Sequence, residues 1–158
     1  MIDRNTDAVL RSDSPLRTEA IGRSLGAALR RGDVLALDGD LGAGKTVLVR
    51  GLAEGAGADP LGVRSPTFVL HHVYRGTAVT LHHVDLYRLG ANAGLDALDV
   101  DTLVEDGALA VEWGAYAPQL DALGAARVHI EVLGDSDRRI TLQGLPAHLR
   151  DALAEAEP

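Results

Sequence analysis

The clearest chemical feature of this sequence is a glycine-rich run that matches G-x-x-x-x-G-K-[ST], namely Gly39-Asp40-Leu41-Gly42-Ala43-Gly44-Lys45-Thr46. In this pattern, glycines allow successive backbone N–H groups to turn toward an anion. The lysine reaches the β and γ phosphates of a nucleotide, and the hydroxyl of the last residue binds Mg²⁺. The alternative is a plain turn that binds nothing. The context favours the first interpretation, because an apolar strand precedes the run and a helical pattern follows it.

Lys45 is the only lysine in the chain, although Lys and Arg together number 15. A general preference for arginine explains the other positions. At position 45 a forked guanidinium cannot replace a compact ammonium inside a closed anion loop. The same count argues strongly against a GTPase, because the guanine-reading pattern Asn-Lys-x-Asp needs a second lysine.

A phosphate-loop enzyme also needs a carboxylate at the end of another core strand, where it orients the hydrated Mg²⁺. Two residues have this position. Glu112 follows the apolar run 108–111, and Asp85 follows the run 81–84. A solvated strand end is the alternative for each, and the residues alone leave both metal candidates open. Asp40 and Asp85 are likewise both candidates for positioning an attacking water.

Three further features lie near these candidates. Thr67 occupies the stretch where other phosphate-loop proteins sense the γ-phosphate through a hydroxyl, although Ser-Pro before it is also a turn signal. Trp113 directly follows Glu112 and is therefore expected near the nucleotide. The histidine pairs 71–72 and 82–83 each place one side chain on either face of a strand, which favours cross-strand packing over a metal site.

The elements that must position these residues form an α/β pattern. The run 34–37 is apolar throughout, as in a strand buried on both faces of a parallel sheet. Apolar residues recur with helical spacing on both sides of it. We expect an edge strand at 8–11, helices at 15–30, 45–56, 96–105 and 146–154, strands at 34–37 and 108–111, a hairpin of 67–74 and 77–84 turning at Arg75-Gly76, and strands at 128–133 and 139–142.

Length and charge narrow the classes of protein. The 158 residues suit one domain, 1–158, with 144–158 as a C-terminal helix and tail. The formal net charge of −8 disfavours unaided binding to nucleic acid. No cysteine is present, which removes disulfides and thiolate sites. No apolar run is long enough for a membrane helix, so we expect a cytoplasmic protein without membrane contact.

Taken together, four motifs resemble the TsaE family, also called YjeE, of bacterial ATPases in tRNA threonylcarbamoyladenosine biosynthesis. The resemblance covers residues 8–143. Its motifs are the glycine-rich run, Ser65-Pro66-Thr67-Phe68, His83-Val84-Asp85-Leu86-Tyr87-Arg88, and Glu105-Asp106-Gly107-Ala108 with Val111-Glu112-Trp113.

The resemblance implies a P-loop NTPase-like three-layer fold with a mixed, mostly parallel sheet and an inserted β-hairpin. It implies Mg²⁺-dependent ATP hydrolysis, slow alone and stimulated by the TsaD–TsaB complex, which modifies adenosine 37 of tRNAs reading codons that begin with adenine. Contact with tRNA would then be indirect. The resemblance assigns the metal to Thr46 and Glu112, makes Asp85 necessary for activity, places Trp113 close to ATP, and adds Arg138 as a basic residue that could contact the nucleotide.

Two other functions remain compatible with the loop. A small-molecule kinase would use the same phosphate site, but such enzymes usually carry an arginine-rich lid, and residues 90–126 contain no arginine. A nucleotide-gated assembly module would bind ATP without needing turnover.

Overall fold

The computed structural model describes residues 6–64, 71–88 and 98–156. Within these ranges, seven strands form one sheet in the order β1-β7-β6-β2-β5-β4-β3. β2 is parallel to β5 and β6, and β4 is parallel to β5, whereas β1–β7, β6–β7 and β3–β4 are antiparallel. The strands are β1 (Thr6–Ser12), β2 (Val34–Asp38), β3 (His71–Arg75), β4 (Thr80–Asp85), β5 (Ala108–Glu112), β6 (Ala126–Val132) and β7 (Arg138–Gln143).

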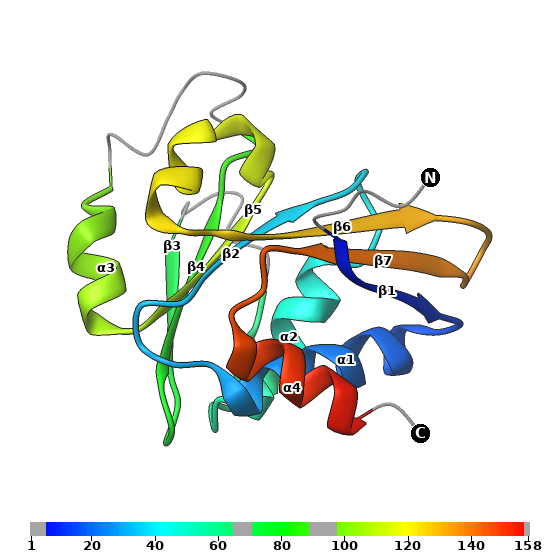
Figure 1. Ribbon diagram of the computed structural model, residues 1–158, viewed down its shortest axis with the longest axis horizontal. Helices are drawn as coiled ribbons and strands as arrows, with labels where there is room; N and C mark the ends of the chain where they lie inside the picture. The colour runs from blue at the N-terminus through cyan, green and yellow to red at the C-terminus, as the bar shows by residue number, and fades with distance from the viewer. Residues whose placement is uncertain (1–5, 65–70, 89–97, 157–158) are drawn as a thin grey trace.

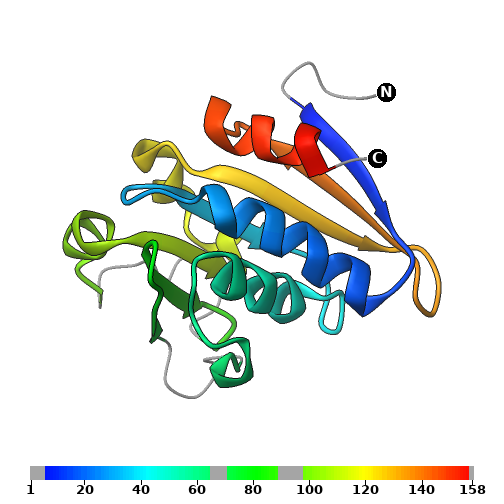
Figure 2. The same cartoon turned by 90° about the horizontal axis from the view of Figure 1, so that it is seen from below.

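Helices cover both faces of this sheet and produce three layers (Figure 1). α1, α2 and α4 lie together on one face, as the view from below shows (Figure 2). α3 and two 3₁₀ segments after β5 lie on the other face. This arrangement confirms the expected three-layer α/β class. The helices are α1 (Pro15–Ala28), α2 (Lys45–Gly55), α3 (Val100–Asp106) and α4 (Ala147–Ala156), with 3₁₀ segments η1 (Pro60–Gly62), η2 (Gly114–Tyr116) and η3 (Pro118–Leu123).

β2 is the central strand, and its side chains reach both cores. Leu35 and Leu37 belong to the apolar cluster under α1 and α2, whereas Val34 and Ala36 belong to the cluster on the other face. A strand that is buried on both sides needs apolar residues at every position, not only at alternate ones. The continuous run therefore predicted the position of β2 correctly, and β2 leads directly into the glycine-rich loop.

Glycines bring the helix after this loop into backbone contact with α1. A Cβ atom on Gly26 would overlap the backbone of Leu52, and one on Gly51 would overlap the backbone of Glu19. Larger residues at these positions would force α1 and α2 apart. The close contact fixes the position of α2, and with it the start of the helix that closes the phosphate loop.

The predicted two-residue hairpin turn is wrong. β3 ends at Arg75, but β4 begins only at Thr80, so residues 76–79 form the connection. The backbone N–H of Thr77 donates to the carbonyl of Gly57, and that of Ala78 donates to the carbonyl of Ala56 at 3.0 Å. These bonds attach the connection to the end of α2 and keep it from continuing the ladder.

The other expected elements are present, with ends shifted by a few residues. β1 lies at the sheet edge, and β6 and β7 form the late antiparallel pair. The helix expected at 96–105 appears as α3, which begins at Val100, and the first residues of the strand expected at 67–74 lie outside the described ranges. In the part of the chain that the structure describes, no helix has both the length and the apolar character needed to cross a membrane.

Candidate nucleotide-phosphate site

The glycine-rich loop connects the end of β2 to the first turn of α2. Gly39, Gly42 and Gly44 have positive φ angles of 152°, 79° and 117°. Gly44 is the N-cap of α2, and no side chain caps that helix start. The free N–H groups at a helix N-terminus, together with its dipole, attract anions. The loop therefore has the backbone shape and the helix end that phosphate binding requires.

A cavity of about 370 Å³ opens in front of this loop. Its walls come from three parts of the chain: the loop and the start of α2, the ends of β4 and β5, and two aromatic side chains. The lining residues are Leu41, Gly42, Gly44, Lys45, Thr46, Val47, Asp85, Tyr87, Glu112 and Trp113. Most of the predicted site residues thus meet at one cavity, although they are up to 72 positions apart (41 to 113) in the sequence.

Lys45 is buried within this site and held by the loop itself. Its Nζ donates hydrogen bonds to the carbonyls of Gly39 and Asp40, the latter at 3.1 Å. The ammonium also lies 4.1 Å from the centre of the Trp113 ring. Burial lowers the pKa of Lys45 below its ordinary value, and the nearby carboxylates of Glu112 and Asp85 oppose that shift. The ammonium is thus desolvated and placed where a phosphate oxygen can accept a stronger, charge-assisted bond.

Thr46 and Glu112 are in direct contact across the cavity. The Thr46 hydroxyl lies 3.1 Å from each carboxylate oxygen of Glu112. Glu112 ends β5 and pairs with Leu37 of β2, which brings the carboxylate to the start of the loop. A hydroxyl and a carboxylate are the hard oxygen ligands that Mg²⁺ prefers. The donor set therefore fits Mg²⁺, and of the two open candidates Glu112 is the one that contacts Thr46.

Asp85 lies beside Glu112 at the end of the neighbouring strand. The two residues pair in register in the parallel ladder of β4 and β5, and both are buried. An Asp85 oxygen accepts a hydrogen bond from the backbone N–H of Tyr87 at 2.9 Å. Asp40, the other candidate for positioning water, has an exposed side chain at the loop. Burial inside the cavity favours Asp85 for that role.

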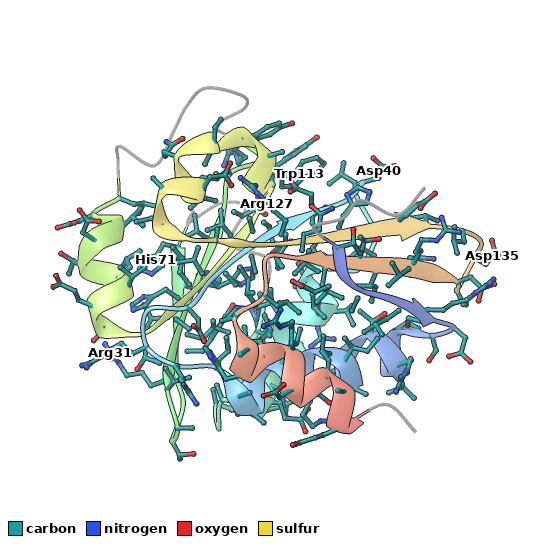
Figure 3. All side chains as sticks on the ribbon, viewed as in Figure 1. Arg31, Asp40, His71, Trp113, Arg127 and Asp135 are labelled. Atoms are coloured by element: carbon teal, nitrogen blue, oxygen red, sulfur yellow. The ribbon has the colours of Figure 1, made fainter. Side chains whose placement is uncertain are left out.

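Trp113 lines the same cavity. Its backbone conformation is unusual for a residue other than glycine. Its φ of 59° is the only positive value among the non-glycine residues that the structure describes. The ring stacks on Tyr116 with 5.6 Å between centroids and lies 5.1 Å from Tyr87. Figure 3 shows Trp113 and Asp40 at the same end of the sheet. The left-handed conformation is costly for a bulky residue and is typical of functional sites.

Arg138 lies on the outer side of the loop. Its Nε donates to the carbonyl of Ala43 at 2.9 Å. It also lines a second, smaller cavity of about 110 Å³ with Ser14 and Thr18, next to the glycine-rich loop. The structure thus places Arg138 against the loop. Thr67, the remaining predicted residue, lies outside the described ranges.

Two residues reach this site that the sequence analysis did not assign to it. Tyr87 lines the cavity and is 42% exposed. His83 is fully buried and lies 2.5 Å from Glu112 through its Nε2. The histidine pairs do make the expected cross-strand contacts, since His71 Nε2 lies 2.9 Å from His82 Nδ1. A sequence pattern could not show that His83 also reaches β5.

The fold and the loop define a phosphate-loop protein of the three-layer α/β class. A family model described as "Threonylcarbamoyl adenosine biosynthesis protein TsaE" matches residues 12–141. The chain therefore belongs to the TsaE family.

Known proteins agree with this assignment. Two relatives carry the name tRNA threonylcarbamoyladenosine biosynthesis protein TsaE. The one from Streptomyces coelicolor is 40% identical over 79% of this chain and 88% of its own length. The one from Bacillus subtilis is 36% identical over 83% of this chain and 82% of its own length. The crystal structure of Bacillus subtilis YdiB has a TM-score of 0.70 and 30% identity, covering 94% of this chain and 93% of that one.

Proposed function

We propose that this protein is a Mg²⁺-dependent ATPase that acts with the TsaD–TsaB complex to form the threonylcarbamoyl group on adenosine 37 of tRNA. The observation that carries the proposal is the contact between Thr46 and Glu112 at the mouth of the glycine-rich loop. Family membership supports the tRNA-modification pathway. The contact supports nucleotide chemistry, because it pairs the two oxygen ligands that a phosphate-loop enzyme uses for its metal.

Each residue of the site has a distinct role in this reaction. Lys45 would bind the outer phosphates, and the N–H groups of the loop would hold the oxygens between them. Thr46 and Glu112 would hold Mg²⁺, which neutralises charge on the transferred phosphoryl group. Asp85 would accept a hydrogen bond from the attacking water. Trp113, which lines the cavity, would lie beside the phosphates and limit the entry of other water.

The composition of the sequence favours ATP over GTP as the nucleotide. The sequence lacks the second lysine that guanine recognition by Asn-Lys-x-Asp needs. ATP therefore suits the site better than GTP.

The charge of the chain supports a role through partners. Its formal net charge is −8. A polyphosphate backbone repels such a protein, and direct binding of tRNA would need a basic surface. We infer that the chain reaches tRNA through the TsaD–TsaB complex and that hydrolysis is slow without it.

Complementation tests this function. A bacterial strain that lacks its own TsaE and the modified adenosine receives this chain, Glu112→Gln, or Glu131→Gln as an exposed control. Mass spectrometry of position 37 should show the modification with the parent chain and with Glu131→Gln, and its loss with Glu112→Gln. ATP hydrolysis with and without added TsaD–TsaB should follow the same order. Full modification by Glu112→Gln would refute the proposal.

A further inference from the structure

His83 is a buried histidine on β4 that contacts the candidate metal carboxylate. We propose that His83 is a positioning residue, which holds the Glu112 carboxylate in the orientation needed to bind the metal. This inference rests on the proposed Mg²⁺ site. His83 would join the residues that support this site, although it does not itself line the cavity.

The strand register explains why His83 reaches Glu112. His83 pairs with Ala110 and Asp85 pairs with Glu112 in the parallel ladder of β4 and β5. His83 therefore lies on the same face of the sheet as Glu112, two residues before the end of β4. Its Nε2 lies 2.5 Å from Oε2 of Glu112. The carboxylate thus has the Thr46 hydroxyl on the cavity side and the imidazole behind it.

The second ring nitrogen of His83 is also held. Its Nδ1 lies 2.8 Å from the hydroxyl of Tyr74, and that hydroxyl lies 3.2 Å from the carbonyl of Arg64. A carboxylate can only accept, so Nε2 carries the proton that it donates to Glu112. Nδ1 is held by its contact with the Tyr74 hydroxyl. Because both nitrogens are bonded and the ring is fully buried, the imidazole cannot turn away from the carboxylate.

Such an arrangement has a known physical effect on metal ligands. Groups behind a ligand fix its orientation, and their loss typically weakens metal binding by 10–100-fold. Without His83, Glu112 could rotate, and one of its buried oxygens would lose a donor. His83 acts on the metal through Glu112 and does not touch the nucleotide, so its removal should alter metal affinity more than nucleotide affinity.

The neighbouring His82 provides a matched control. It is also buried, but it faces the other side of the sheet, where its Nε2 contacts Asp106 at 2.7 Å and its Nδ1 contacts His71. A substitution at His82 removes the same side chain from the same strand. It should change stability without changing the metal site.

The experiment measures Mn²⁺ affinity by electron paramagnetic resonance in complexes of the full chain with a non-hydrolysable ATP analogue. Affinity for the analogue in EDTA is measured from the fluorescence of Trp113. We expect His83→Leu to weaken Mn²⁺ binding about 10–100-fold and to leave analogue affinity in EDTA nearly unchanged. His83→Gln, which keeps an N–H donor, should restore most of the Mn²⁺ affinity. His82→Leu should bind Mn²⁺ like the parent.

Parent-like Mn²⁺ binding by His83→Leu would overturn the inference, as would an equal loss in His82→Leu. If His83→Leu does not fold, Tyr74→Phe decides the question. It removes one hydroxyl from the support of His83 and should weaken Mn²⁺ binding about 3–10-fold, while unchanged binding would refute the role. If the parent complex binds no Mn²⁺, the proposed function itself fails.

Discussion

The two halves of the sheet use charged residues in opposite ways. In the parallel half, made by β2, β5 and β4, Lys45, Asp85 and Glu112 are buried around one cavity. The other half, made by β6, β7 and β1, is called the antiparallel half because β7 is antiparallel to both its neighbours. None of the charged residues described on these three strands is buried. Arg139 and Glu131, for example, form a 2.8 Å ion pair with each side chain 49% exposed. Residue type alone would not distinguish the two sets, whereas burial does.

The difference follows from the residues that end the strands. The carboxyl ends of parallel strands meet at one edge, so Asp85 and Glu112 arrive side by side next to the loop that follows β2. β6 and β1 run in the same direction, because β6 is parallel to β2 and β7 is antiparallel to both, but they end at Val132 and Ser12 and bring no carboxylate to this edge. β6 and β7 instead supply apolar packing through Ile130 and Ile140, while Arg138 at the start of β7 supports the loop from outside. We therefore expect changes in the parallel half to affect ligand binding and changes in the antiparallel half to affect stability.

The largest effect should come from Lys45→Ala. Its ammonium is buried and already donates to two carbonyls, and phosphate oxygens would replace or join these acceptors. Two charge-assisted hydrogen bonds contribute about 1.5–3 kcal/mol each, so ATP affinity should fall by at least about 100-fold. Titration of Trp113 fluorescence with ATP measures this loss.

Lys45→Arg provides the control for charge. If the shape of the ammonium matters, the bulkier guanidinium should also weaken binding by tenfold or more. Parent-like ATP binding by the arginine variant would show that charge alone suffices. It would also remove the explanation for the single lysine in the chain.

Much of the fold could be predicted because several segments carry strong local patterns. Residues 34–37 are apolar at every position, which only a doubly buried strand needs, and the helical spacing of 45–56 is clear. The hairpin turn could not be predicted. Its bonds go from Thr77 and Ala78 to the end of α2, which is a tertiary contact. Local turn signals at Arg75-Gly76 contained no information about it.

The candidate site was also only partly predictable from the sequence. The loop and both carboxylates could be found, because each follows an apolar run and phosphate chemistry requires them. The choice of Glu112 over Asp85 as the partner of Thr46 depends on the position of β5 next to β2. The role of His83 depends on its register against Ala110. Neither pairing leaves a signal in a single sequence.

The next largest effect concerns the antiparallel half, through Ile140→Ala. Ile140 is fully buried in the main core. Removal of this much side chain from a packed core costs about 2–5 kcal/mol, so the free energy of unfolding in urea should fall by that amount. ATP affinity of the folded protein should stay within about twofold of the parent. A large loss of affinity at a temperature where the variant is fully folded would break the distinction between the halves.

A smaller effect is expected from Thr46→Val in the parallel half. The change keeps the shape of the side chain but removes the hydroxyl that contacts Glu112. The increase in ATP-analogue affinity on addition of Mg²⁺ should drop about tenfold, because one oxygen ligand is lost. Affinity measured in EDTA should change little, and Thr46→Ser should retain the increase. An unchanged response to Mg²⁺ in the valine variant would exclude Thr46 as a metal ligand.

The smallest effect should come from Arg139→Ala, although the ion pair that it breaks is only 2.8 Å long. The partner of Arg139 is Glu131, and both side chains are half exposed, so water already screens their attraction. Exposed pairs of this kind contribute about 0.2–1 kcal/mol. The free energy of unfolding should therefore fall by less than about 1 kcal/mol, and by still less at high salt. ATP affinity should match the parent, because neither residue of this pair lines the cavity. A loss larger than that of Thr46→Val in any assay of nucleotide binding would mean that the open face of β6 and β7 is part of the site.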